Sequence, residues 1–174
     1  MEDYLEAEAA SDMWHEYVDG TLVAMAAETM RHDDIVLNVV EALRPVARAK
    51  GCKLHATSIR TRVRATRYRY PDVVVSCEAM MDARQLEHPC FILEVLSEST
   101  ADTDTGKKLE EYTKLPSMQT YLIVAQTEPR VVVYERDSGG WRVEVLEGQG
   151  EIRVACLQAN LSLEAIYAGV NFGE

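Results

Sequence analysis

The sequence contains no long hydrophobic run. With 47% hydrophobic and 27% charged residues it has the composition of an ordinary globular protein. None of its apolar stretches approaches the roughly 20 residues that cross a bilayer. The first twenty residues are acidic and contain no apolar core segment, so they do not resemble a signal peptide. We therefore expect a cytoplasmic protein with no membrane partner.

The four cysteines form no CxxC pair. Cys52, Cys77, Cys90 and Cys156 each stand alone, in or beside apolar sequence. Zinc sites are normally recognised in a sequence by closely spaced pairs of ligands. The spacing therefore predicts reduced, packed thiols and no zinc site.

Basic residues are scarce relative to acidic ones. The chain has 18 lysines and arginines against 29 aspartates and glutamates, a net charge of −11. This charge excludes non-specific binding of nucleic acid by the surface as a whole. A local basic face is still possible, because five arginines fall within ten residues: Arg60, Arg62, Arg64, Arg67 and Arg69. The first three alternate along one strand face, which predicts a ridge that contacts a nucleic-acid backbone.

No repeat, low-complexity tract or linker divides the chain, so residues 1–174 are expected to form a single domain. Turn residues and apolar periodicity predict a hairpin around Asp19-Gly20, a helix between Thr29 and Gly51 with a kink or break at Pro45, and a second helix over 102–115. Strands are predicted at 53–57, 59–64, 70–76, 90–96, 120–125, 130–135 and 141–146, and a short final helix at SLEAIY. This order indicates an α/β or α+β fold: a mixed central β-sheet flanked by helices, with an added antiparallel meander.

Two of the predicted strands each carry a single acid in an apolar run. Glu94 lies within CFILEVLS and Asp72 within YPDVVVS, and carboxylates are almost never fully buried without a partner. If the strands pair antiparallel with Ser76 opposite Cys90, then Asp72 lies opposite Glu94, because both pairs of numbers sum to 166. Facing carboxylates repel each other. One must therefore take a proton, a basic side chain must bridge them, or a divalent cation must bind.

A lysine on the following helix is the third candidate. In DTGKKLEEYTKL, Asp104, Lys108 and Tyr112 are four residues apart and share one helical face. Lys108 stands at the border of an apolar stripe that includes Leu109. From there its ammonium group can reach toward the strand that carries Glu94.

An acid, a glutamate on the next strand and a lysine on the following helix resemble the PD-(D/E)XK nuclease superfamily. Pro71-Asp72 matches the first half of its motif and Glu94-Val95-Leu96 the second. More closely, the chain resembles the Uma-type branch of restriction-endonuclease-like proteins over roughly residues 14–136. The matching pieces, in order, are EYVDGTLVAM, His32 opening a helix, YPDVVVS, ILEVLSEST, and Asp104-x-x-x-Lys108-x-x-x-Tyr112 followed by TYLIV.

The resemblance implies a Mg²⁺- or Mn²⁺-dependent endonuclease that hydrolyses phosphodiester bonds in DNA. Its metal ligands would be Asp72, Glu94 and the backbone carbonyl of Val95. Lys108 would orient water or stabilise the phosphate. Two further catalytic residues are expected in the same pocket, because a glutamate and a histidine of the branch match Glu16 and His32. Small nucleases of this type often act as homodimers.

The chain also departs from the family pattern. Position 96, where the superfamily has lysine, is leucine, and the branch carries that lysine on the next helix, which corresponds to Lys108. The branch has a Gly-Val-x-Glu-Tyr-Trp run and an aspartate after the next strand, where this chain reads LPSMQTYLIVAQ. Two alternatives therefore stay open: a catalytically inactive nuclease-fold homodimer that acts as a binding or interaction module, and a hydrolase of small phosphate esters.

Each candidate residue also has a purely structural interpretation. Asp72 after a proline is typical of a strand start, Lys108 of a solvated helix face and His32 of a helix cap. Glu94 alone is consistent with a structural salt bridge to an arginine at 60–69, and those arginines with an exposed face paired to surplus carboxylates. The ordered combination of Asp72, Glu94 and Lys108, together with the resemblance, favours the catalytic interpretation.

Overall fold

The structure is a computed structural model of the 174-residue chain. It describes residues 4, 8, 11, 14–25, 27–57, 59–79, 85–96 and 104–173, with the side chains of residues 104 and 105 outside this set. The elements follow in chain order: β1 (His15–Val18), β2 (Thr21–Ala24), α2 (Met30–Ala49), β3 (Lys53–Ala56), β4 (Arg60–Arg64), β5 (Arg67–Arg69), β6 (Val73–Ser76), β7 (Gln85–Leu86), β8 (Phe91–Leu96), η1 (Asp104–Lys108), α4 (Leu109–Thr113), β9 (Thr120–Ala125), β10 (Arg130–Asp137), β11 (Gly140–Glu147), β12 (Glu151–Val154), η2 (Ala155–Leu157), β13 (Ala159–Ser162) and α5 (Leu163–Ile166).

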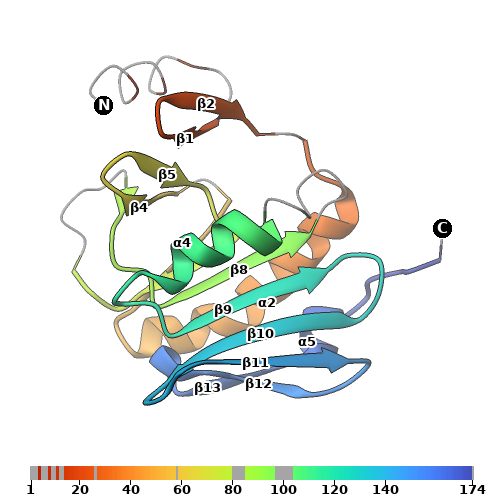
Figure 1. Cartoon of the computed structure of the whole chain (residues 1–174). Helices are drawn as coiled ribbons and strands as arrows, with labels where there is room; N and C mark the ends of the chain where they lie inside the picture. The colour runs from red at the N-terminus through yellow and green to blue at the C-terminus, as the bar shows by residue number, and fades with distance from the viewer. Residues whose placement is uncertain are drawn as a thin grey trace.

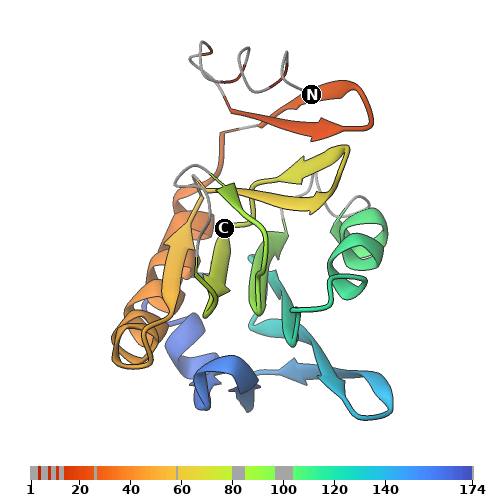
Figure 2. The same cartoon turned by 90° about the vertical axis from the view of Figure 1, so that its left-hand side faces the viewer.

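A six-stranded sheet forms the centre of the fold, in the order β11-β10-β9-β8-β6-β3. β8 and β9 run parallel, joined by the segment that contains α4, and the other neighbouring pairs are antiparallel. Figure 1 and Figure 2 show α2 on one face of this sheet and α4 on the other. The predicted mixed sheet flanked by helices is confirmed, and β9, β10 and β11 form the antiparallel meander.

Side chains of the central sheet divide between two hydrophobic cores. On β8, Phe91, Leu93 and Val95 belong to the core under α2, and Ile92 belongs to the core under α4. The division follows from the strand period, because successive residues point to opposite faces. Both faces are covered, which explains why the strand reads as a continuous apolar run. Glu94 is in phase with Ile92 and therefore faces the α4 side.

A second sheet, in the order β2-β1-β5-β4-β7, lies above the central one in the view of Figure 1. It begins with the predicted hairpin of β1 and β2, whose turn residues Asp19 and Gly20 both have positive φ, 47° and 98°. Such angles match the right-handed twist of a tight hairpin. The strand predicted over 70–76 is shorter than expected and begins at Val73, while Arg67–Arg69 joins the second sheet as β5.

The first predicted helix is confirmed as α2. Its cap is Thr29, whose Oγ1 accepts a hydrogen bond from the His32 backbone N–H at 3.1 Å. Of the predicted kink or break at Pro45, the break is wrong, since α2 continues to Ala49. Pro45 is exposed, so the carbonyl of residue 41, which loses its intrahelical donor, lies on a face that water can reach. Within the described part of the chain, no helix is long and apolar enough to cross a membrane.

The second predicted helix is replaced by two shorter pieces. Residues 102 and 103 lie outside the described residues, and the chain then forms the π-helical turn η1 before the short helix α4. Strands β7, β12 and β13 were not predicted. They are only two to four residues long, so the polar–apolar alternation visible in β12 is too short to identify a strand.

The prediction of isolated, reduced cysteines is wrong. Cys52 is bonded to Cys77 and Cys90 to Cys156, across 25 and 66 residues of sequence. All four lie at ends or connections of strands, where the folding of the sheets brings them together. Spacing along the chain cannot reveal a pairing that depends on sheet order.

Candidate active site

Glu94 is the most deeply buried member of the candidate site, with 2% of its surface exposed. Its carboxylate accepts hydrogen bonds from Lys108 Nζ at 3.0 Å and from the Tyr112 hydroxyl at 2.7 Å. Burial, together with the charge of Glu94, raises the pKa of Tyr112 well above its ordinary value. The hydroxyl therefore stays a neutral donor. Both donors come from the segment after β8; the contact of Lys108 was predicted, and that of Tyr112 was not.

Lys108 joins Glu94 to a second carboxylate. It lies at the end of the π-helical turn η1, is 7% exposed, and its Nζ is 3.6 Å from Glu16 Oε1. Glu16 comes from β1 in the second sheet, so this lysine bridges the two sheets of the molecule. Glu16 therefore lies in the same pocket as Lys108, as predicted. The interpretation of Lys108 as a solvated helix residue is wrong, because its side chain is buried.

Behind Glu16 lies a buried ion network that the sequence did not reveal. Arg69, 2% exposed, donates to Glu16 and also to both oxygens of Glu111, at 2.8 and 3.0 Å. Arg67 donates to Glu111 and to Asp19. Burial opposes ionisation of Glu111, but the two arginines outweigh it and lower its pKa. The network binds Oε2 of Glu16, whereas Lys108 lies beside its Oε1.

Asp72 lies just before β6 and is fixed by two donors on one oxygen. Its Oδ2 accepts from the Val95 backbone N–H at 2.7 Å and lies 3.2 Å from His32 Nε2. The side chain is 13% exposed. The contact with Val95 follows from the strand register, since Val73 pairs with Leu93 and Val75 with Phe91. The residue numbers in each pair sum to 166, which is the register that the sequence predicted.

His32 approaches Asp72 from the first turn of α2. It is 2% exposed, and its Nε2 also lies 3.9 Å from Glu28 Oε2. Burial lowers the pKa of the imidazole, but the hydrogen bond and charge of Asp72, with Glu28 and Asp33 nearby, outweigh burial and raise that pKa. His32 is therefore biased toward the charged form and forms an ion pair with Asp72.

A glutamine that was not predicted as a site residue positions the start of α2. Gln126, directly after β9, donates to the Leu96 carbonyl at 2.8 Å and accepts from the Thr29 hydroxyl at 2.7 Å. It thereby ties the helix cap beside His32 to the end of β8. Only its place after TYLIV, where the family pattern has an acid, could have drawn attention to this part of the sequence.

The site is thus built from two halves that meet at one peptide link. Glu94, Lys108 and Glu16 form the half on the α4 side, and Asp72 with His32 forms the half next to α2. The N–H that Asp72 accepts belongs to the Glu94–Val95 peptide bond, so both halves are anchored to the same stretch of β8. This arrangement brings all five predicted catalytic residues to one end of the central sheet.

The three arginines predicted as a nucleic-acid ridge are placed unequally. Arg60 is buried, with its guanidinium 5.7 and 5.3 Å from the ring centroids of Tyr4 and Tyr68. Arg62 is partly exposed and bound to Glu87 at 3.0 Å. Arg64 is exposed. The ridge is therefore narrower than predicted, because burial of Arg60 removes it from any surface contact.

Comparison with known proteins agrees with this fold. A crystal structure from Anabaena variabilis, described as that of a "putative nuclease belonging to DUF820", superposes with a TM-score of 0.75, covers 95% of this chain and 96% of that one, and is 17% identical in sequence. The likeness shows a nuclease-like fold. Residues 1–165 match the Uma2 family, described as "Putative restriction endonuclease". The chain belongs to this family.

Two relatives from Synechocystis sp. match most of this chain. Two uncharacterized proteins of Synechocystis sp. are each 27% identical to this chain. The first match covers 98% of this chain and 92% of that protein, and the second covers 77% and 78%. The predicted resemblance to the Uma-type branch is confirmed, and it extends beyond the residues 14–136 on which it was based.

Proposed function

We propose that this protein is a Mg²⁺-dependent nuclease that hydrolyses phosphodiester bonds in DNA. The observation that carries the proposal is the meeting of Asp72, Glu94 and Lys108 around the Glu94–Val95 peptide link. Membership of the Uma2 family supports the reaction class. Metal dependence and the choice of DNA are inferences from the chemistry of the residues.

The donor set fits a hard divalent cation. Asp72 and Glu94 supply carboxylate oxygens, and because both donors to Asp72 use its Oδ2, its Oδ1 keeps acceptor capacity. The third donor is the Val95 carbonyl. The N–H and C=O of a strand residue point to the same side, so this carbonyl faces β6, as the N–H does. In the register Val95 stands opposite Pro71, which has no N–H to donate. Such oxygen donors suit Mg²⁺.

The side chains around these donors have separate tasks. A bound Mg²⁺ would supply charge for the phosphoryl oxygens and lower the pKa of a water ligand. Lys108 presents an ammonium group beside Glu94, where it can orient the attacking water and stabilise negative charge in the transition state. Tyr112 holds the other oxygen of Glu94 in place. His32 orients Asp72 and adds positive charge to that half of the site.

The surface charge of the molecule restricts how DNA is engaged. At a net charge of −11, association depends on local cations rather than on a general attraction. Arg64 is the exposed member of the predicted ridge and contacts the phosphate backbone in this proposal. Salt dependence of binding should accordingly be shallow, because few phosphates are neutralised.

The alternative of a non-catalytic, homodimeric binding module has one observation in its favour. The buried charge of Glu94 is already balanced by Lys108 at 3.0 Å, so the fold does not depend on a cation for compensation. A buried charge paired in this way is stable without catalysis. The two functions differ in whether a divalent ion binds.

Calorimetric titration with Mg²⁺ and Mn²⁺ separates them. We compare the parent with Asp72→Asn and with Asp137→Asn, the same change at an exposed residue of β10. The parent and Asp137→Asn should bind the ion and nick plasmid DNA. Asp72→Asn should lose binding, with cleavage reduced by about 10²-fold or more, the scale of a lost charge-stabilising group.

The substrate class is tested in the same series with plasmid DNA, RNA and a chromogenic phosphodiester. A parent protein that binds neither ion and cuts nothing contradicts the nuclease proposal and supports the binding module. Cleavage of the chromogenic ester alone identifies a hydrolase of small phosphate esters. Cleavage that persists in Asp72→Asn removes Asp72 from the metal site.

A further inference from the structure

The four cysteines converge at the end of the central sheet opposite the candidate active site. Lys53 of β3 pairs with Ser76 of β6, so Cys52 and Cys77 face each other one position beyond the ladder, with Cα atoms 4.1 Å apart. Asp72 and Cys77 lie at opposite ends of β6. Five residues of extended chain separate them by about 16 Å. The cysteine cluster therefore shares no residue with the site described above.

Two further cysteines approach from other layers. Cys90 directly precedes β8, next to β6, and Cys156 lies in the 3₁₀ turn η2 between β12 and β13. The Sγ atoms of Cys77, Cys90 and Cys156 all lie within 4.8 Å of one another, and Cys77 Sγ is 3.9 Å from Cys90 Sγ. The fourth sulfur, that of Cys52, lies next to this group, because it is bonded to Cys77.

We propose that, in the reduced protein, these four cysteines bind one Zn²⁺ ion as a tetrathiolate site. Zinc takes four thiolates at about 2.3 Å in a tetrahedron, whose sulfur–sulfur edges are about 3.8 Å. The separation of 3.9 Å between Cys77 and Cys90 matches such an edge. Cys52, beside Cys77, supplies the fourth ligand. With four protein ligands no position is left for water, so the site is structural.

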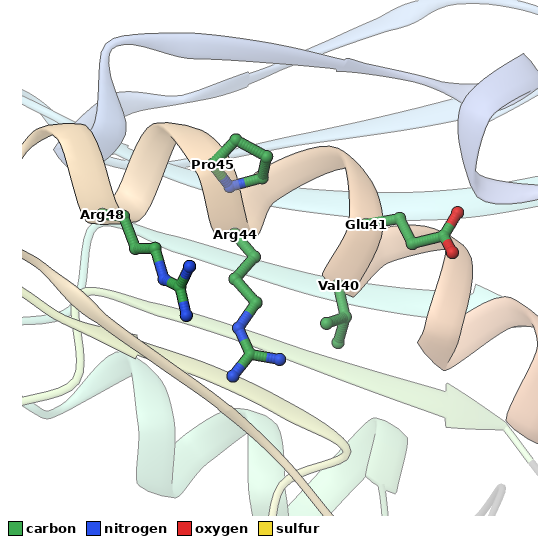
Figure 3. A pocket seen from close by; sticks show the side chains of 5 residues that line it. All are labelled: Val40, Glu41, Arg44, Pro45 and Arg48. Atoms are coloured by element: carbon green, nitrogen blue, oxygen red, sulfur yellow. The ribbon is translucent and has the colours of Figure 1, made fainter.

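The surroundings favour the negative charge of such a site. A cavity of about 270 Å³ beside Cys52 is lined by Arg44, Arg48, Lys53 and His55. Figure 3 shows Arg44 and Arg48 extending from α2 on the same side of the helix. Among the described residues these two arginines and Lys53 have no ion-pair partner. Four thiolates and one Zn²⁺ carry a net charge of −2, which this basic wall offsets.

The same positive charges affect the pKa of a neighbouring histidine. Burial lowers the pKa of His55, and the charges of Lys53 and Arg44 lower it further. Arg44 and Arg48 also line a second cavity, of about 490 Å³, over the outer side of α2 (Figure 3). Positive charge therefore accumulates around the C-terminal half of α2, in a chain whose net charge is −11.

The disulfide-bonded and zinc-bound forms exclude each other, because a sulfur in a disulfide is not a thiolate. Conversion of the first form into the second takes two steps. Two equivalents of a dithiol reduce the Cys52–Cys77 and Cys90–Cys156 bonds to four thiols and leave two oxidised dithiols. Zn²⁺ then replaces the four thiol protons, which are released. Cys77 is exposed, so a soluble reductant can reach the pair that contains it.

The test uses the untagged full-length chain after reduction and removal of metal. Titration with Co²⁺ under anaerobic conditions should saturate at one equivalent, with sulfur-to-cobalt charge-transfer bands and the intense visible bands of a tetrahedral ion. Zn²⁺ should displace the Co²⁺ and abolish both sets of bands. Cys77→Ser and Cys156→Ser should each lose or strongly weaken the charge-transfer bands. Asp72→Asn should keep them, which separates this site from the proposed catalytic ion.

The parent protein alone is sufficient to overturn the proposal if a cysteine variant does not fold. Co²⁺ spectra without charge-transfer bands in the reduced parent would mean that no thiolate binds the ion. The native protein is also treated with excess dithiol, and its free thiols are counted by alkylation and mass spectrometry. If both disulfides persist, the cluster consists of two structural disulfides and the proposal is wrong. Two results would support the site: one Zn²⁺ per reduced chain in native mass spectrometry, and protection of all four thiols from alkylation when Zn²⁺ is bound.

Discussion

At the scale of single residues, the candidate site depends on how each buried charge is compensated. Glu94, almost fully buried, is held by an ammonium and a hydroxyl group. Asp72 is held by an imidazole and a backbone N–H. Leaving either carboxylate without its donors would cost several kcal/mol, by order of magnitude. These contacts keep the carboxylates in place in the ion-free protein.

Protonated His32 should stabilise the folded protein at low pH. The pKa of His32 is raised in the folded state above its unfolded value of about 6.5, because the hydrogen bond and charge of Asp72 outweigh burial. The contribution is therefore fully present below about pH 6.5 and is lost as the pH rises through the folded pKa. We expect the difference in unfolding free energy between the parent and His32→Gln to decrease over that range, measured by urea denaturation at a series of pH values.

An NMR titration of the His32 ring checks the cause. The ring should titrate above about 6.5 in the parent. In Asp72→Asn its pKa should be lower than in the parent, since burial then acts with less opposition. A ring that titrates below the unfolded value in the parent would show that Asp72 does not carry the effect.

At the scale of elements, the start of α2 decides where His32 points. Thr29 caps the helix and also donates to Gln126, which binds the end of β8. The hydroxyl thus serves a helix terminus and a tertiary contact at once. The cap was predictable, because it depends on neighbours in the sequence. The contact with Gln126 was not, since 97 residues separate the two side chains.

Thr29→Ala should destabilise the protein by about 1–2 kcal/mol, the range of a lost helix cap. Thr29→Ser, which keeps the hydroxyl, is the matched control and should remain within about 0.5 kcal/mol of the parent. Urea denaturation of the three proteins measures the difference. Equal losses in the two variants would mean that the methyl group, rather than the cap, matters.

At the scale of the whole molecule, a chain of ion pairs, buried except at its exposed first member Asp19, holds the two sheets together. It runs from Asp19 through Arg67, Glu111 and Arg69 to Glu16, and Lys108 continues it to Glu94. Glu111 is the centre of this chain, because it accepts from both arginines. The interpretation of the 60–69 arginines as exposed partners of surface acids therefore fails for Arg67 and Arg69, which are buried.

Replacing Glu111 by glutamine should be strongly destabilising. Removing one partner of a buried ion pair costs about 3–5 kcal/mol, because the remaining charge is uncompensated. The neighbouring Glu110 is exposed and binds Lys114, so Glu110→Gln is the matched control. Its unfolding free energy should match that of the parent, because an exposed ion pair is screened by water. Chemical denaturation compares the two variants, and similar losses in both would contradict a central role for Glu111.

The sequence by itself determined the features that depend on near neighbours. The Asp19-Gly20 turn, the Thr29 cap and the alternation of cores follow from local backbone and solvent preferences. The register of β6 against β8 was also predictable, because consecutive strands joined by a loop have few economical registers. The two carboxylates do not share a partner as expected, since Asp72 contacts His32 and the Val95 N–H whereas Glu94 is held on the α4 side. The placement of Lys108 followed from its spacing along one short segment.

Only the tertiary structure decided which distant side chains meet. Arg69 and Glu111 are 42 residues apart, and the four cysteines come from four separate connections. Their contacts depend on the order of strands and on how the second sheet lies over the first. No local pattern encodes that order, because a strand has the same period whichever neighbour it pairs with. The buried ion network and the sulfur cluster are therefore properties of the folded chain.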